Sequence, residues 1–183
     1  MRFSRILAAS CIALPLLALN AGCGGTQGPA AAEGAHPLVG QKAPAFTAEA
    51  VTGEGPTNLG DAAGRVVIVD FWATYCAPCR KSFPKYQELM DQFGGDLTVI
   101  AVSVDDPEDA SKEQLTEFAT STGVKFAIVW DKDKSVAGSY KPPKMPTSFV
   151  IDKQGVVRHI HAGYESGEEQ TIASEVEALI KAP

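Results

Sequence analysis

The stretch Val69-Asp70-Phe71-Trp72-Ala73-Thr74-Tyr75-Cys76-Ala77-Pro78-Cys79 places a Cys-x-x-Cys pair where an apolar strand gives way to a helix. Residues 66–73 are too apolar and β-branched for a loop, which predicts a buried strand. Beyond the pair, large apolar residues recur at helical spacing: Phe83, Tyr86, Met90 and Phe93. We therefore expect the cysteines at the carboxyl end of a strand and in the first turn of a helix, a placement typical of a redox-active dithiol.

The spacing of Cys76 and Cys79 also predicts their chemistry. Residues three apart on a helical turn bring their Cβ atoms to about 5 to 6 Å, so small adjustments allow a disulfide. The sulfur of Cys76 should face free backbone N–H groups and the positive end of the helix dipole, which favour the thiolate. Cys76 is therefore the expected nucleophile, and the more shielded Cys79 is expected to resolve the mixed disulfide by intramolecular attack.

Three other uses of this pair are weaker. A zinc site would need two more ligands, and the remaining cysteines, Cys11 and Cys23, lie in the leader. A structural disulfide would close a very short loop and add little stability. A c-type haem would need His directly after the second cysteine, where this chain has Arg80. We expect neither a metal nor a cofactor at this site.

Residues 1–22 are built like a secretory signal peptide, in which two arginines precede an apolar stretch and small residues follow. The apolar stretch from Ile6 to Leu19 is interrupted by Pro15 and is short for a transmembrane helix. The leader is therefore not expected to be part of the fold.

The end of the leader, Leu19-Asn20-Ala21-Gly22-Cys23, resembles the processing box of bacterial lipoproteins, in which the cysteine becomes the lipidated first residue. The resemblance implies a lipid anchor on Cys23. Asn20 stands where the box has a large aliphatic residue, so ordinary cleavage after Ala21, which would leave a secreted protein, stays open.

Residues 23–36 contain no large apolar side chain and predict a flexible tether. Residues 37–183 are enough for one domain with a core. Loss of the leader removes Arg2 and Arg5 and no acidic residue, so the formal net charge changes from −6 to −8. This negative charge argues against nucleic acid as a partner.

Strand and helix patterns alternate along the domain. We expect strands at 66–73, 97–104, 126–130, 147–152 and 156–162, and helices at 78–93, 107–122, 133–139 and 167–181. The alternation predicts an α/β fold with a central mixed sheet between helices, in which the last two strands form an antiparallel hairpin.

Turn and cap residues refine these boundaries. Residues 39–50 and 57–61 predict a short, irregular N-terminal β extension with Gly and Pro turns. Asp106 before Pro107 predicts the start of the helix at 107–122. Ser166 with Glu169 predicts a capping box for the last helix.

The order of elements, the strand ending in FWATYCAPC, Pro84 five residues after Cys79 and the Met145-Pro146-Thr147 turn together resemble a thioredoxin fold. The motif Val39-Gly40-x-x-Ala43-Pro44-x-Phe46 and a central insertion from Asp106 to Lys125 resemble, more narrowly, the TlpA/ResA-like group of extracytoplasmic thiol-disulfide oxidoreductases. The resemblance covers about residues 37–181.

This resemblance implies that Cys76 and Cys79 are the nucleophilic and resolving cysteines and that Pro146 is a cis-proline facing them. A cis bond would turn the backbone of Met145 toward the cysteines, where an extended substrate could pair with it. The expected substrate contacts are Met145, Trp72 and Tyr75. The expected partners are disulfide-containing client proteins and a membrane electron-donor protein, and we expect a monomer.

Two departures from the group concern the neighbourhood of the dithiol. Ser82 stands where many members carry Glu, so no mechanism can be taken from an acid there, and Tyr75 stands where most relatives have Trp. Asp70 lies six residues before Cys76, where thioredoxin has a buried acid. Its apolar neighbours predict a desolvated carboxyl group with a raised pKa that accepts the proton of Cys79, and an exposed carboxylate at the strand end is the alternative.

Other polar residues have simpler interpretations. His159 and His161 share one face of a strand, and a solvated edge pair is favoured over a metal site. The acidic residues Asp105, Asp106, Glu108 and Asp109 surround a predicted helix start, which helix capping and the helix dipole explain better than a docked partner.

These observations favour an extracytoplasmic, membrane-tethered thiol-disulfide oxidoreductase that works as a reductant, because Ala77 and Pro78 offer no side-chain donor to stabilise a strongly oxidising thiolate. Cytochrome c maturation is the best-known task of the group it resembles. A thiol peroxidase is the second enzyme hypothesis, although Thr74 lies two rather than three residues before Cys76. The non-enzyme hypothesis is a copper-binding metallochaperone that uses the dithiol and a histidine.

Overall fold

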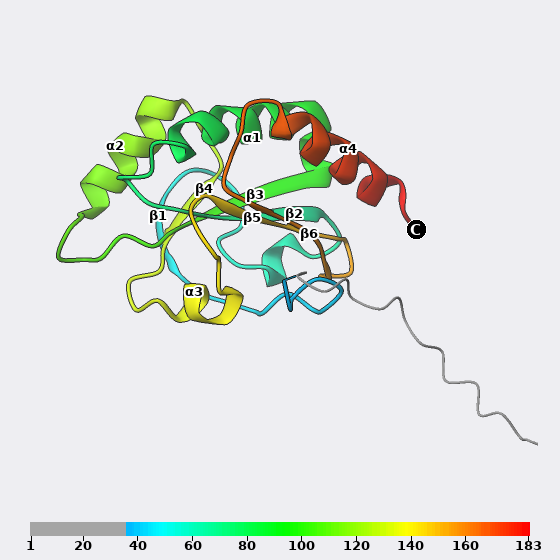
Figure 1. Cartoon of the computed structure of the whole chain (residues 1–183), viewed down its shortest axis with the longest axis horizontal. Coiled ribbons are helices and arrows are strands. Elements are labelled where there is room, and N and C mark those ends of the chain that lie inside the picture. Colours follow the sequence, from blue (N-terminus) through cyan, green and yellow to red (C-terminus); the bar gives the residue numbers. More distant parts are fainter. Residues whose placement is uncertain (1–35) are drawn as a thin grey trace, which may run out of the picture. The chain divides into compact units, whose positions relative to one another are not determined.

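The computed structural model describes residues 36–183, which form a six-stranded mixed sheet with helices on both faces (Figure 1). The strand order in the sheet is β1-β4-β3-β2-β5-β6. The strands are β1 Glu49–Thr52, β2 Val66–Trp72, β3 Leu97–Ser103, β4 Ala127–Trp130, β5 Thr147–Ile151 and β6 Val157–Ala162. The helices are α1 Cys79–Phe93, α2 Lys112–Thr122, α3 Ser135–Tyr140 and α4 Glu168–Lys181.

Strand β2 is central, parallel to β3 on one side and antiparallel to β5 on the other. All of its residues are buried, because the strand is covered on both faces. The register places Asp70 opposite Ala101 of β3 and Ser148 of β5. The middle of β2 is therefore closed to water from every side, as in a strand covered by helices.

Two apolar layers result from the alternation of side chains along β2. Ile68 and Trp72 pack beneath α1, α2 and α4, whereas Val69 and Phe71 pack on the opposite face with α3. Figure 1 shows α1, α2 and α4 on one side of the sheet and α3 on the other. By the same alternation, Asp70 faces the α1 layer, between Ile68 and Trp72.

The predicted thioredoxin-like architecture is confirmed, and most predicted elements begin and end within two residues of the observed ones. The helix predicted at 107–122 is an exception, because α2 begins only at Lys112. Asp106 does not cap it; its backbone carbonyl closes a single turn with the N–H groups of Asp109 and Ala110. The helix is instead capped by Ser111, whose hydroxyl accepts from the N–H of Gln114 in a reciprocal capping box.

The capping box predicted for the last helix does not form either. The N-cap residue of α4 is Gly167, which has no side chain with which to cap the helix. The carboxylate of Glu169 accepts from the N–H of Gly167 and from the Tyr164 hydroxyl, so it supports the first turn without Ser166.

The N-terminal β extension is shorter and lies later in the chain than predicted. Its one full strand is β1, which pairs antiparallel with β4 at the edge of the sheet. Residues 57–61, predicted as part of a β element, instead lead into the 3₁₀ turn Gly60–Ala62. The proposed central insertion contributes α2, which packs beside β1.

The predicted signal peptide, the lipidation site at Cys23 and all of the tether except its last residue lie outside the described residues. His36, where the tether was predicted to end, packs its ring edge-on against Phe149 at a centroid distance of 5.4 Å. Among the described helices, none combines the length and apolar character needed to cross a membrane.

Candidate active site

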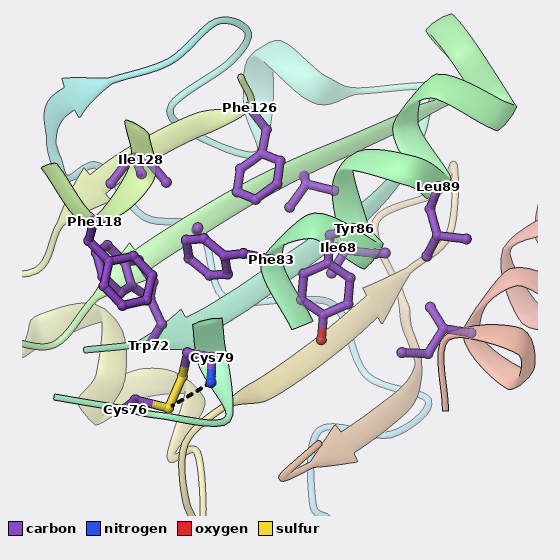
Figure 2. Close-up of a cluster of buried hydrophobic side chains, with 14 of the residues drawn as sticks. Ile68, Trp72, Cys76, Cys79, Phe83, Tyr86, Leu89, Phe118, Phe126 and Ile128 are labelled. Carbon is purple, nitrogen blue, oxygen red and sulfur yellow. Dashed lines mark hydrogen bonds between the residues drawn. A yellow bond between two sulfur atoms is a disulfide. The ribbon is translucent and has the colours of Figure 1, made fainter. Parts of the chain in front are cut away.

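Cys76 and Cys79 form a disulfide at the amino end of α1, with their Cα atoms 5.3 Å apart. Cys79 is the first residue of the helix, and Cys76 lies in the turn before it. The Sγ atom of Cys76 accepts a hydrogen bond from the backbone N–H of Cys79 at 3.2 Å, shown as a dashed line in Figure 2. Cys76 retains 6% exposure and Cys79 none, so the outer sulfur also has the N–H contact that stabilises a thiolate.

Trp72 lies beneath the disulfide and is completely buried (Figure 2). Its ring centroid is 4.5 Å from that of Phe118 and 5.1 Å from that of Phe83. The prediction that Trp72 contacts substrate is therefore wrong, since no surface of the ring is accessible. Its role is to pack the layer on which the dithiol rests.

The Met145–Pro146 bond is cis, as the resemblance implied. Pro146 is buried, and the partly buried Met145 packs against the same apolar cluster as both cysteines. A groove of about 620 Å³ adjoins this turn, lined by Pro78, Lys144, Met145, Ala162, Gly163, Tyr164, Glu165, Ser166, Gly167, Glu168 and Thr171. Tyr75, next to Cys76, is 71% exposed and offers an aromatic face to solvent.

Asp70 is fully buried, as predicted, and is not an exposed strand-end carboxylate. Burial raises the pKa of Asp70 from its ordinary 3.8 to about 8, although hydrogen bonds from Ser148 and Tyr86 act in the opposite direction. The Ser148 hydroxyl donates to Oδ1 at 2.8 Å. Oδ2 has no hydrogen-bond partner among the described residues.

Ser148 and Tyr86 join the site without having been predicted to do so. The Tyr86 hydroxyl and Ser148 Oγ are hydrogen-bonded, and both side chains are buried. Tyr86 lies seven residues after Cys79, hence on the same face of α1, which was a usable sequence signal. Ser148 carries no comparable local signal, because its position opposite Asp70 depends on how β5 pairs with β2.

Asp105 is a second buried carboxylate near the dithiol, and the prediction that it merely surrounds a helix start is wrong. It accepts from the backbone N–H of Thr74 at 3.0 Å, from the Thr74 hydroxyl at 2.6 Å and from the Ser103 hydroxyl at 2.8 Å. It thus ties the loop before Cys76 to the end of β3. The carboxyl ends of parallel strands meet at one sheet edge, which was the available signal.

The nearby Ser82 is buried and places its hydroxyl 3.3 Å from the carbonyl oxygen of Cys79, in the first turn of α1. It therefore supplies no carboxylate at the position where many relatives have Glu. The guanidinium group of Arg80 lies over the ring of Phe118, 4.3 Å from its centroid.

Strand β6 is an edge strand, and the side chain of His159 is 40% exposed, as expected for a solvated edge residue, whereas His161 is 12% exposed, which corrects the sequence interpretation for that histidine. Nδ1 of His161 is 3.2 Å from a carboxylate oxygen of Glu168, and its Nε2 is 2.7 Å from one of Glu175. His159 also contacts Glu175, at 3.2 Å. These contacts join β6 to α4. Within residues 36–183, no group of three or more His, Cys, Asp or Glu side chains is arranged to hold a metal ion.

A helix-capping disulfide above a mixed sheet, beside a cis-proline turn, is the arrangement of a thioredoxin-like redox protein. A family model described as the AhpC/TSA family matches residues 39–160. The chain belongs to this family, whose model covers most of the domain.

Two curated relatives show what kinds of protein the chain is similar to. Thioredoxin-like protein YneN of Bacillus subtilis (strain 168) is 36% identical over 124 residues, which cover 68% of this chain and 71% of YneN. Thiol-disulfide oxidoreductase ResA of Bacillus anthracis is 33% identical over 132 residues, which cover 72% of this chain and 73% of ResA.

Solved structures agree with this. A Chlorobium tepidum protein assigned as the thiol:disulfide interchange protein DsbE superposes with a TM-score of 0.68 at 31% identity, covering 78% of this chain and 97% of that protein. A secreted thiol-disulfide isomerase from Corynebacterium glutamicum has a TM-score of 0.67 at 23% identity, over 78% of this chain and 86% of its own, and supports the fold alone.

The first prediction concerns the stability cost of Asp70. The unfolded chain ionises this carboxyl near pH 4 and the folded protein near pH 8, so stability is lost progressively as pH rises between these values. We expect Asp70→Asn to stabilise the oxidised protein by about 1 to 3 kcal/mol at pH 7 and by little at pH 4. Denaturant unfolding at the two pH values measures the difference.

Asp96→Asn is the matched control, because Asp96 is exposed and should change stability little at either pH. If Asp70→Asn is less stable than the wild type at pH 7, burial of the Asp70 carboxyl group does not cost the folded protein stability at that pH.

The second prediction concerns the loop before the dithiol. Removing the Asp105 carboxylate leaves the Thr74 and Ser103 groups without their acceptor, so Asp105→Ala should lower the free energy of unfolding by about 2 to 3 kcal/mol. Asp106→Ala is the control. The Asp106 carboxylate is exposed and forms a surface ion pair with Lys134, which is worth at most about 1 kcal/mol. Equal losses for the two variants would contradict the assignment.

Proposed function

We propose that this protein is an extracytoplasmic, membrane-tethered thiol-disulfide oxidoreductase that reduces disulfides in client proteins. The observation that carries the proposal is the asymmetry of the dithiol. Cys76 is the outer cysteine, and its sulfur accepts a helix N–H, whereas Cys79 is fully buried in the layer that holds Asp70. This asymmetry supports the proposal that Cys76 attacks the client from solvent and that Cys79 resolves the mixed disulfide by intramolecular attack.

In the proposed reaction the Cys76 thiolate attacks one sulfur of a client disulfide. A Cys76–client mixed disulfide forms, and the other client sulfur leaves as a thiolate. Cys79 then loses its proton and attacks the Cys76 sulfur, which releases the second client thiolate. The client is reduced by two electrons, and the Cys76–Cys79 bond is formed.

Asp70 is proposed as the base that takes the Cys79 proton. A carboxyl group with a pKa of about 8 is close in proton affinity to a thiol, so the proton can move in either direction with little free-energy change. The fully buried Cys79 is shut off from solvent bases. The Asp70 carboxylate, which lies on the face of β2 that is turned toward α1, is proposed to be the base that solvent cannot supply.

The client is proposed to lie in the groove beside the cis-proline turn. Met145 lines this groove and packs against the cluster that contains both cysteines. Tyr75 presents an exposed ring next to Cys76. An extended client segment passing between them would bring its disulfide to the outer sulfur.

The compartment and the electron supply belong to the same proposal. In an oxidising environment the dithiol needs a reducing partner, which we propose is a membrane electron-donor protein. The ResA relatives are named thiol-disulfide oxidoreductases. Reduction of cysteines during cytochrome c maturation is the task we propose first for a monomer of this kind.

The thiol peroxidase alternative is disfavoured by the loop before Cys76. The Thr74 hydroxyl is committed to Asp105 at 2.6 Å, so it does not point at the sulfur to orient a peroxide. The copper-binding alternative is disfavoured because His161 is held by Glu168 and Glu175 on α4.

The third prediction tests the roles of the two cysteines. Cys79→Ser removes the resolving thiol, so Cys76 should remain in stable mixed disulfides with clients, which non-reducing electrophoresis and mass spectrometry would identify. Cys76→Ser is the matched control and should trap none. The reverse pattern would mean that the roles are exchanged.

The redox state of the same clients, measured after they react with the protein, shows the direction of electron flow. Reduced wild-type protein should convert their disulfides to thiols. If the oxidised protein instead forms client disulfides and the reduced protein leaves them intact, the protein is an oxidant and the proposed reductase function is wrong.

The fourth prediction concerns the anchor. Cys23 lies at the end of a lipoprotein-like processing box, and a diacylated, N-acylated cysteine holds a soluble domain at a membrane. Mass spectrometry of the mature protein should therefore find Cys23 as a lipidated amino terminus, and Cys23→Ser should release the domain from the membrane fraction. An unmodified amino terminus at Gly22 or Cys23 would show that the domain is free.

A further inference from the structure

A chain of hydroxyl groups ends on one oxygen of the buried acid. Ser148 Oγ is 2.8 Å from Oδ1 of Asp70, and the Tyr86 hydroxyl is hydrogen-bonded to Ser148 Oγ. The three side chains come from β2, β5 and α1, and each is at most 1% exposed. Figure 2 shows the Tyr86 hydroxyl directed away from the axis of α1.

When Asp70 is a carboxylate, the hydrogens of this chain run toward it. A serine hydroxyl has one hydrogen, and Ser148 donates it to Asp70, so the Tyr86 hydroxyl must be the donor to Ser148. Tyr86 as well as Ser148 lowers the pKa of Asp70, and Asp70 raises that of Tyr86, as expected when the hydrogens of both hydroxyls point toward the acid. Oδ1 therefore remains an acceptor.

The other oxygen of Asp70 is left for the proton. Oδ2 is buried without a hydrogen-bond partner in residues 36–183, and so is Nε1 of Trp72, two residues further along the same face of β2. Both cysteines belong to the apolar cluster that includes Trp72. The vacant oxygen thus lies in the layer beneath the dithiol.

We propose that Ser148 and Tyr86 are positioning residues that hold Oδ1 of Asp70 and so reserve Oδ2 as the atom that takes and returns the proton of Cys79. The inference rests on the proposed function and adds the groups that control its proton step. In the forward direction the Cys79 S–H bond breaks, an O–H bond forms at Oδ2, and the Cys79 thiolate attacks the Cys76 sulfur of the mixed disulfide. The reverse transfer restores the thiol when the protein is reduced again.

Among the described groups around Asp70, the Ser148 and Tyr86 hydroxyls are the ones that lower its pKa. On β3 its neighbour in register is Ala101, which does not titrate. Burial raises the pKa of Tyr86, and so does the nearby negative charge, which includes that of Glu168 on α4. On β6, His161 lies opposite Ser148 and is held by Glu168 and Glu175. No Lys or Arg of the described chain contributes to the pKa shift of Asp70, so its two hydroxyl neighbours are what offset burial.

Removing the Ser148 hydroxyl should therefore raise the pKa of Asp70 further, because a donor that favours the carboxylate is lost. Less carboxylate is then present at a given pH, and resolution of the mixed disulfide should require a higher pH. The rate reports the coupled titration of Asp70 and Cys79 rather than either group alone.

The fifth prediction uses this shift. Reduced full-length protein is mixed rapidly with excess insulin, and resolution of the mixed disulfide is followed from pH 6 to 10 by acid quenching and thiol alkylation. For Ser148→Ala the midpoint of the pH profile should move upward by about one unit. Tyr86→Phe should move it in the same direction by less, and Ser148→Thr, which keeps the hydroxyl, should restore the wild-type midpoint.

Thr98→Val is the control for loss of a buried hydroxyl elsewhere in the sheet, and it should leave the midpoint unchanged. A merely structural Ser148 would lower stability or scale all rates without moving the midpoint, and that result overturns the inference. If Ser148→Ala does not fold, an unmoved midpoint in Tyr86→Phe overturns it. Wild-type protein that forms no mixed disulfide with insulin or with trapped clients would instead overturn the proposed function.

Discussion

The burial of the Asp70 carboxyl group, which no cation within residues 36–183 offsets, is the constraint on which the chemistry of this site depends. A carboxylate in an apolar layer costs free energy that a surface carboxylate does not, so its proton affinity rises to that of a thiol. The cost is tolerated because β2 is the middle strand of the sheet and has close neighbours on both edges and both faces. The same burial shields Cys79 and leaves Cys76 as the outer sulfur.

The two buried carboxylates of the site have separate tasks. Asp105 accepts several hydrogen bonds and fixes the loop that leads into Cys76, so its interactions are structural. Ser148 donates to one oxygen of Asp70, and the other has no hydrogen-bond partner in the described part of the chain, an arrangement that suits proton transfer. The two carboxylates differ in their position in the sheet. Asp105 follows the end of β3, where the loop before Cys76 needs a hydrogen-bond acceptor. Asp70 lies in the middle of β2, where the layer beneath the dithiol needs a base.

Much of the fold followed from local pattern. The junction between β2 and α1 was predicted correctly from the apolar run before Cys76 and the helical spacing after Cys79. The burial of Asp70 was predicted correctly from its apolar neighbours, because the residues of β2 themselves indicate a buried strand. Asp106 before Pro107 has the sequence pattern of a helix start, but this segment forms a turn. Asp106 pairs there with Lys134, which is distant in sequence. The capping box of Ser111 and Gln114 was visible in the sequence. Trp72 and Ser148 were not predictable in the same way, since the ring packs on Phe118 of a distant helix and the serine meets Asp70 only through strand pairing.

The most direct test of the account is the ionisation of Asp70 itself in the oxidised protein. Carboxyl-labelled aspartate gives a ¹³C resonance for each side chain, and Asp70→Asn assigns the one that matters. The account predicts that this resonance titrates with a midpoint near pH 8, far above the ordinary value of 3.8 for an aspartate side chain. A midpoint for Asp70 near pH 4 would contradict it, because the carboxyl would then be ionised throughout the working range and could not exchange a proton with Cys79.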